Sequence, residues 1–236
     1  MSFSVTRKIG NDAEVQWIIP DRVLRNEFVL LDGRGETGKS SLISKIIGDW
    51  HNAPNATKEG KLNRVLWLSQ EEEFDPIIKP RLMQYGLDES QVLTIDYASG
   101  ANKRPLLPAN YSPMELLIRY NGINCMVVDP FEELKESEWS VNDGDMMRTY
   151  ISSLSRLAKQ TKCTIFGMRH MRKSVGTYSA DEGRGSAMIR DTARCVIRTD
   201  RTEEKQRKYY WSVQKCNSAK PTMPVEFAFE NTPHNF

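Results

Sequence analysis

The segment that most restricts the fold of this chain is Gly33-Arg34-Gly35-Glu36-Thr37-Gly38-Lys39-Ser40, which fits the pattern G-x-x-x-x-G-K-[ST]. The apolar stretch Phe28–Leu31 leads directly into it, and residues 41–47 continue with apolar positions at helical spacing. A strand, a glycine-rich turn and a helix in this order present backbone N–H groups and a helix N-terminus to an anion. The sequence therefore predicts a phosphate-binding loop at the edge of an α/β sheet.

Each part of this loop has a predicted task in binding ATP and Mg²⁺. Gly33, Gly35 and Gly38 allow the backbone to turn tightly and to approach the phosphates. Lys39 is expected to reach the β- and γ-phosphates, and the Ser40 hydroxyl is expected to bind Mg²⁺. The other residues expected to surround the nucleotide are Arg34, Glu36, Thr37 and Ser41.

Strands and helices alternate along the 236 residues and are followed by strands without helices between them. This order predicts one domain of the α/β class, with a mostly parallel sheet flanked by helices and antiparallel strands at the C-terminal end. Residues 1–26 are expected to be a docking segment, 27–200 the core, and 201–236 a hairpin and last strand. No apolar run reaches the roughly eighteen residues of a membrane span, and the N-terminus lacks a signal-peptide core, so a cytoplasmic location is expected.

The hydrophobic patterns assign most of these elements. Apart from the strand before the loop, strands are expected at residues 17–20, 62–69, 92–96, 123–129, 163–168, 195–198, 209–213 and 225–229. Helices are expected at residues 41–47, 76–86, 114–120 and 145–160, and Ser112-Pro113-Met114-Glu115 has the form of a capping box. Residues 97–111 and 171–184 are expected to be loops.

Two acidic positions follow predicted strands. Asp129 ends the nearly apolar strand 123–129 and is expected to hold Mg²⁺, directly or through water, as a Walker B acid does. Glu71, after the strand 62–69, is the candidate base that deprotonates the water attacking the γ-phosphate. The alternative for Ser69–Glu73 is a solvated acidic turn.

Basic groups late in the chain complete the predicted site. Arg169-His170 ends the strand after residue 163, and His170 is expected either to contact the γ-phosphate or to be a structural histidine. Arg190, Arg194 and Lys215 are candidates for reaching across a subunit boundary, as an arginine finger does.

Charge is distributed unevenly. Residues 1–150 carry 17 basic and 23 acidic side chains, a net of −6, whereas residues 151–236 carry 16 and 8, a net of +8. This asymmetry predicts a basic face that could meet nucleic acid or an acidic neighbouring subunit, or else scattered solvated charges. The four cysteines form no C-x-x-C pair, so reduced buried thiols are expected instead of a zinc site.

The motifs follow one another in the order Trp17–Pro20, the P-loop, Leu66–Glu72 with Arg81-Leu82, Val127–Pro130, Arg169–Lys173, Gly185–Ala187, Asp191–Arg194 and Val213–Asn217. In this order the chain resembles the RecA-type ATPases of the RepA-like group, relatives of hexameric replicative helicases found on plasmids and phages. The resemblance implies a RecA-like core, a homo-oligomeric ring, expected to be a hexamer, and ATP bound between subunits. It implies that Lys39, Ser40, Glu71 and Asp129 act as described above and that His170 senses the γ-phosphate. It also implies that Arg194 and Lys215 reach the adjacent subunit.

The chain departs from the group at several positions. Arg169-His170 stands where relatives often have His-His, and Arg34 and Glu36 are charged where small or neutral residues are usual. The segment 132–138 is acidic and unsuited to a DNA backbone, so the loop after His170, with Arg172, Lys173 and Tyr178, is the better candidate for contacting DNA.

The expected function is Mg²⁺-dependent ATP hydrolysis by a ring-forming motor on single-stranded DNA, together with replication or recombination partners. The alternatives are an ATP-gated recombinase or mediator filament, and a nucleotide-gated switch or assembly ATPase that acts on a protein.

Overall fold

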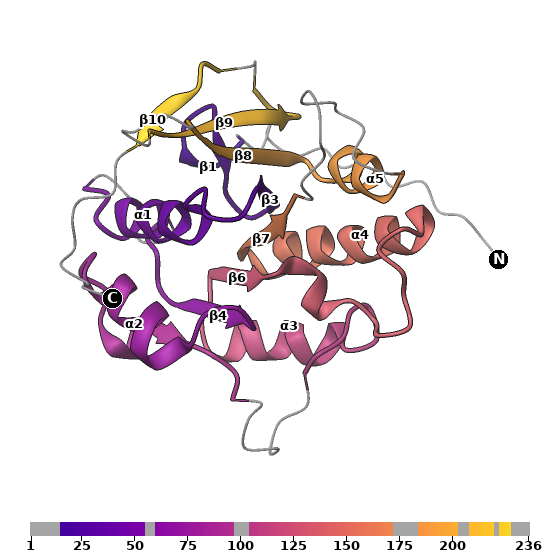
Figure 1. Cartoon of the computed structure of the whole chain (residues 1–236). Coiled ribbons are helices and arrows are strands. Elements are labelled where there is room, and N and C mark those ends of the chain that lie inside the picture. Colours follow the sequence, from indigo (N-terminus) through magenta and orange to yellow (C-terminus); the bar gives the residue numbers. More distant parts are fainter. Residues whose placement is uncertain are drawn as a thin grey trace, which may run out of the picture.

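A computed structural model of the chain describes residues 15–54, 60–96, 104–171, 184–202, 208–219 and 222–227. Its centre is one mixed sheet, mostly parallel, in which the last strands run antiparallel (Figure 1). Its strands lie in the spatial order β10 (Val225–Phe227), β9 (Tyr209–Cys216), β8 (Cys195–Arg201), β3 (Phe28–Gly33), β7 (Thr164–His170), β6 (Cys125–Asp129), β4 (Val65–Ser69) and β5 (Val92–Leu93). The predicted fold class is confirmed.

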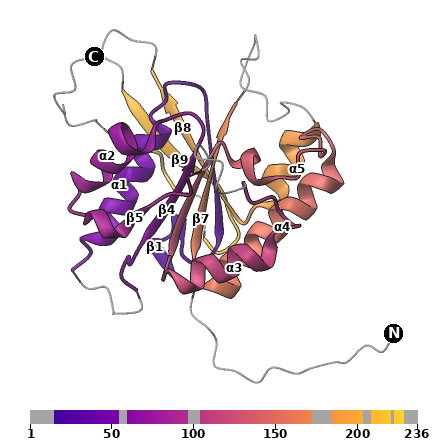
Figure 2. The same cartoon turned by 90° about the horizontal axis from the view of Figure 1, so that it is seen from below.

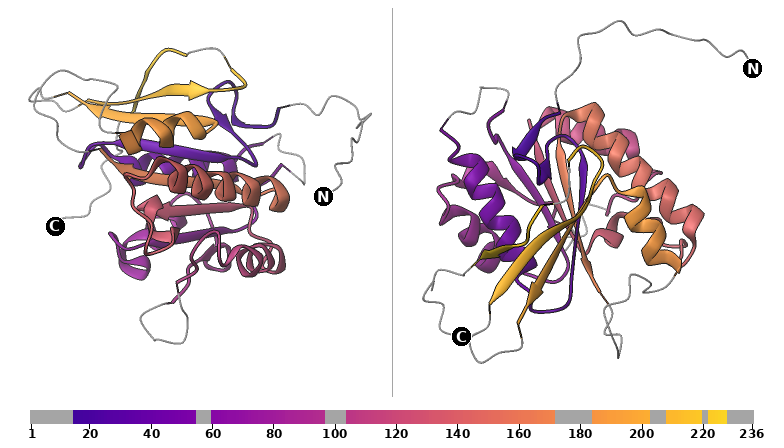
Figure 3. Two further views of the ribbon diagram at one scale, coloured as in Figure 1. Left: turned by 90° about the vertical axis from the view of Figure 1, so that its right-hand side faces the viewer. Right: turned by 90° about the horizontal axis from the view of Figure 1, so that it is seen from above.

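Helices cover both faces of this sheet, which is seen between two helical layers in Figure 2. One face carries α1 (Lys39–His51) and α2 (Lys79–Met83), the latter preceded by a π-helical turn, Phe74–Ile78. The other face carries α3 (Tyr111–Tyr120), α4 (Gly144–Thr161) and α5 (Arg184–Thr192), and α5 packs beside α4 (Figure 3). Short 3₁₀ turns occupy Glu89–Gln91 and Phe131–Leu134, and β1 (Trp17–Ile19) and β2 (Val23–Leu24) form a separate antiparallel pair.

The alternation of side chains along β3 explains the two layers. Val29 and Leu31 pack toward α1, whereas Phe28 and Leu30 pack toward α4, and all four side chains are fully buried. Successive residues of a strand point to opposite faces, so a strand covered on both sides reads as continuously apolar. The apolar stretch before the phosphate-binding loop is thus the centre of the sheet.

Several expected elements need correction. The predicted strand 92–96 shortens to Val92–Leu93, and the capping box at Ser112 is wrong because α3 already begins at Tyr111. Asn110 precedes that helix, and its side chain accepts a hydrogen bond from the Leu106 backbone N–H. The pair β1–β2 was expected only in part, and α5 was not expected at all.

Other expected elements are present with shifted bounds: the strand expected at 62–69 begins at Val65, and the helix expected at 76–86 is the turn Phe74–Ile78 followed by α2, which ends at Met83. The hairpin of β8 and β9 and the long helix α4 are present, and β8 extends to Arg201. All four cysteines are free; three are buried and Cys216 is half-buried. Most of the predicted loop 171–184, including Arg172, Lys173 and Tyr178, lies outside the described residues. Among the described residues, no helix combines the length and apolar character needed to cross a membrane.

Candidate nucleotide site

The carboxyl ends of the parallel strands bring the predicted site residues together. In the register of the sheet, Gly33 of β3 lies beside His170 of β7 on one side and Thr199 of β8 on the other. Asp129 ends β6 and pairs with Ser69 of β4. Ligands of open parallel sheets bind at this edge, because the loops that leave the strands there can hold them.

The loop between β3 and α1 has the backbone that a phosphate-binding turn requires. Gly38 precedes α1 with a φ of 78°, in the left-handed region that favours glycine. Glu36 also has a positive φ, 60°, and its carboxylate is held by Arg201 of β8, with 2.8 Å between Oε2 and Nη1. The predicted loop residues Arg34, Gly35, Thr37 and Ser41 lie in this turn and at the start of α1.

The space around Gly33 leaves no room for a side chain. A Cβ at this position would lie 2.3 Å from Thr199 Oγ1 and 2.7 Å from Thr37 Oγ1, and these two hydroxyls are themselves 2.7 Å apart. The methyl group of an alanine would therefore push the Thr37 side of the loop away from β8.

We expect Gly33→Ala to weaken ATP binding about ten-fold, which corresponds to a loop displacement costing about 1.4 kcal/mol. Gly35→Ala is the matched control, because a Cβ at Gly35 would meet nothing within 4 Å. Titration of a fluorescent ATP analogue into both variants checks the prediction, and equal affinities for the two variants would contradict it.

Lys39 connects the loop to the strands beyond it. Its Nζ is 3.3 Å from the Gly33 carbonyl oxygen, 3.0 Å from that of Arg34, and 3.2 Å from Nδ1 of His170. Burial lowers the pKa of this ammonium, while the carboxylates of Asp129, Glu71 and Asp32 act in the opposite direction. Lys39 is only 6% exposed, so protein atoms surround most of its side chain.

The predicted base and sensor touch each other. Nε2 of His170 lies 2.7 Å from Oε2 of Glu71. Ser69 Oγ accepts hydrogen bonds from the backbone N–H groups of Glu71 and Glu72, so the turn after β4 is well defined. Glu72 forms a bidentate ion pair with Arg81, which leaves Glu71 as the glutamate that faces His170. Lys39, His170 and Glu71 therefore form a continuous polar chain.

Asp129 is buried beside these three residues, and one of its carboxylate oxygens has no hydrogen-bond partner in the described part of the chain. The residue is 2% exposed, and the oxygen in question is Oδ1. Burial, with the charges of Glu71 and Glu72, raises its pKa to about 7. One ligand atom each from Glu71, Asp129 and His170 lie within 4.8 Å of one another. A buried carboxylate with such an oxygen in this cluster fits a divalent cation, and the oxygens of Asp129 and Ser40 are the donor type that Mg²⁺ prefers.

The sequence did not identify every residue at this edge. Thr199 and Arg201 contact the loop because β8 runs parallel to β3, a placement that the hairpin interpretation did not include. Arg169, the neighbour of His170 in sequence, points into the interior and pairs with Asp32. The polar residues at the end of β8 were the sequence signal that could have identified Thr199 and Arg201 as site residues.

The predicted inter-subunit residues lie at the opposite edge of the sheet. Arg194 precedes β8 at the level of Phe28, five residue steps from Gly33, or roughly 17 Å at the rise of a strand. Its Nε lies 3.5 Å from Oε1 of Glu27. Lys215 donates to the carbonyl oxygens of Arg190 and Asp191 at the end of α5. Neither Arg194 nor Lys215 reaches the loop of its own subunit.

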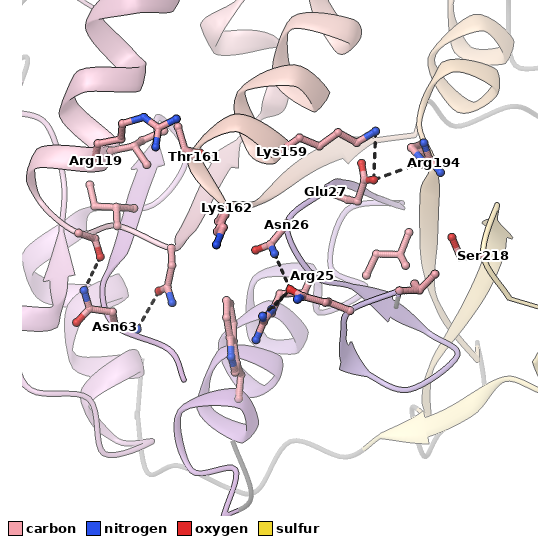
Figure 4. A pocket seen from close by; sticks show the side chains of 18 residues that line it. Arg25, Asn26, Glu27, Asn63, Arg119, Lys159, Thr161, Lys162, Arg194 and Ser218 are labelled. Carbon is pink, nitrogen blue, oxygen red and sulfur yellow. Dashed lines mark hydrogen bonds and ion pairs between the residues drawn. The ribbon is translucent and has the colours of Figure 1, made fainter. Parts of the chain in front are cut away.

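A cavity of about 830 Å³ opens at this opposite edge. Figure 4 shows Glu27 between Lys159 and Arg194, with Arg25, Arg119 and Lys162 nearby. Glu27 is the single carboxylate among these charged side chains, so the lining of this cavity is basic.

Comparison with known proteins agrees with this geometry. A comparison with curated proteins finds no match. A family model described as an AAA domain matches residues 1–176, which is more than half of the chain. The matched range includes the phosphate-binding loop, Glu71, Asp129 and His170. The chain therefore belongs to the AAA-domain family of P-loop, nucleotide-dependent ATPases.

Proposed function

We propose that the protein hydrolyses ATP with Mg²⁺ as a ring-forming, RecA-like motor of the RepA-like type that acts on single-stranded DNA. The observation that carries the hydrolytic part is the series of contacts from Lys39 through His170 to Glu71, next to Asp129 Oδ1, which has no hydrogen-bond partner among the described residues. A group that binds phosphate, a carboxylate that accepts a proton and a site for a cation are the parts that phosphoryl transfer to water requires.

In this proposal each side chain has one task. Lys39 binds the γ-phosphate oxygens and holds them in line with the attacking water. Glu71 accepts the proton of that water, and His170 orients the Glu71 carboxylate through Nε2. Mg²⁺, held by Ser40 and Asp129, would neutralise charge on the β- and γ-phosphates. His170, which contacts both Lys39 and Glu71, is the proposed sensor of the γ-phosphate.

The ring gives the basic edge a role. In a head-to-tail assembly, the basic edge of one subunit would face the nucleotide edge of the next, which holds Glu71 and Asp129. Arg194 and Lys215 would then reach a neighbour's ATP, where a cation stabilises the charge of the transition state. This requires Arg194 to exchange its contact with Glu27 for one with the nucleotide.

Shared sites predict complementation between two inactive variants. Lys39→Ala and Arg194→Ala should each be inactive alone, and an equal mixture should regain activity in roughly one site of four, since only those sites combine intact halves. ATP turnover of the mixture measures this, and a mixture of Lys39→Ala with Lys215→Ala tests the second candidate in the same way. A mixture as inactive as its components would contradict the shared site.

Single-stranded DNA is proposed as the polymer on which the motor acts, because the C-terminal third of the chain carries the excess of basic residues, which bind phosphates. We expect DNA to accelerate ATP turnover several-fold, and the stimulation to decline between low and physiological salt as counterions compete. Electron microscopy with ATP and DNA should show closed rings, whereas open filaments would favour the recombinase or mediator alternative.

The second candidate function is a nucleotide-gated switch that acts on a protein. The segment 132–138 after β6 favours it, because four glutamates and one lysine give this segment a net negative charge that would repel the DNA backbone. ATP turnover that is unaffected by DNA at every salt concentration would favour this alternative over the motor.

A further inference from the structure

A buried ion pair lies directly behind the nucleotide site. Arg169 of β7 and Asp32 of β3 form two hydrogen bonds of 2.8 Å each, Nε to Oδ1 and Nη2 to Oδ2. The side chains are 8% and 0% exposed. Removing two charges from water costs free energy that their attraction often does not recover, so stability alone is a weak reason for such a pair.

The position of this pair in the sheet suggests another reason. Asp32 and Arg169 are register partners on neighbouring parallel strands, and the next partners are Gly33 and His170. The Met171 N–H also donates to the Gly33 carbonyl oxygen at 3.0 Å, so the two strands remain joined beyond the pair. Gly33 and His170 each supply one of the atoms that hold Lys39 Nζ.

The alternation of side chains along a strand places the Asp32–Arg169 pair on the opposite face of the sheet from His170. Asp32 and Arg169 point toward the face covered by α4, whereas the side chain of His170 points the other way. Glu132, in the turn after β6, also interacts electrostatically with Arg169. Burial raises the pKa of Glu132 to about 7. The guanidinium therefore lies among three segments that carry the site: the P-loop strand, the strand of His170 and the turn after Asp129.

We propose that Arg169 is a positioning residue of the nucleotide site: with Asp32 it fixes Gly33 against His170, so that Lys39 and Glu71 hold the imidazole from opposite sides. This inference rests on the proposed hydrolysis. It gives Arg169 a role that requires no contact with ATP.

The arrangement assigns a tautomer to His170, which gives a readout independent of turnover. A protonated lysine can only donate, so Nδ1 of His170 accepts from Lys39. Nε2 then carries the proton and donates to Glu71. If the pair fixes this geometry, its loss should allow the ring to leave Lys39, and both tautomers should be populated.

The experiment removes both charges together. Arg169→Met alone would leave Asp32 buried without a partner and unfold the protein, whereas Asp32→Leu/Arg169→Met replaces the pair with apolar groups of similar size. The matched control is Lys45→Met/Asp49→Leu, which removes the exposed ion pair of α1. For each protein we would measure the melting temperature, kcat, and ¹⁵N chemical shifts of imidazole. The last are assignable because the chain has three histidines.

We expect the Asp32→Leu/Arg169→Met protein to fold, with kcat lowered about ten- to a hundred-fold, as a displacement near 1 Å produces. The His170 nitrogen shifts should move toward a tautomer mixture, and the control should match wild type. In a His170→Ala background the same double change should have little further effect on kcat. Unchanged His170 shifts, or an equal loss of kcat with and without His170, would overturn the inference. A wild-type protein that fails to hydrolyse ATP would instead overturn the proposed function, and the shifts would still test the positioning role.

Discussion

Lys39→Ala is expected to lower the rate of ATP hydrolysis about a hundred- to a thousand-fold, the effect of removing one preorganised donor from a developing charge. The ammonium of Lys39 is buried and is held by the carbonyl oxygens of Gly33 and Arg34 and by His170. Its position therefore needs little adjustment when phosphate arrives. ATP turnover at saturating nucleotide measures the loss, and a fluorescent analogue measures how much of it is lost binding.

Lys45→Ala is the matched control, because Lys45 lies on the same helix and pairs with Asp49 in solvent. An exposed pair of this kind contributes about 0–1 kcal/mol to stability, so this variant should retain wild-type turnover. Turnover by Lys39→Ala at the wild-type rate would show that the loop does not carry the reaction. A melting temperature well below that of Lys45→Ala would show that the loss came from unfolding instead.

The nucleotide site was predictable to the extent that it depends on local pattern. The glycine spacing and the apolar strand before it placed Lys39, and the rule that parallel strands end at one edge brought Asp129 and His170 to it. Glu71 followed from its position nearest the end of the strand, while the three adjacent glutamates left a solvated acidic turn as the alternative. The structure shows why Glu71 faces His170: the side chain of Glu72 is taken up by Arg81.

The errors came from features that only the assembled sheet decides. The sequence pairs Arg169 with His170, but alternation sends adjacent residues of a strand to opposite faces, and the partner of Arg169 lies 137 positions away. The strand β8 could be placed in a hairpin with β9, yet nothing local indicates that its other edge lies against β3. Thr199 and Arg201 were missed for this reason.

Glu71→Gln is expected to lower kcat about a hundred- to ten-thousand-fold, the range contributed by a positioned general base. The amide has nearly the same shape as the carboxylate and can still accept a hydrogen bond from His170 Nε2, but it cannot take a proton from water. ATP should therefore bind with nearly wild-type affinity while turnover fails. Single-turnover measurements with radiolabelled ATP separate the two effects.

Glu73→Gln is the control that separates chemistry from charge. Glu73 is exposed, and this substitution changes the net charge of the same acidic turn by the same amount. If Glu71 only contributes a general negative potential, the two variants should lose similar fractions of activity, and they should respond alike to added salt. If Glu71 is the base, Glu73→Gln should remain close to wild type. The proximity of Glu71 to His170 and Asp129, which Glu73 lacks within the described structure, is the reason to expect the second result.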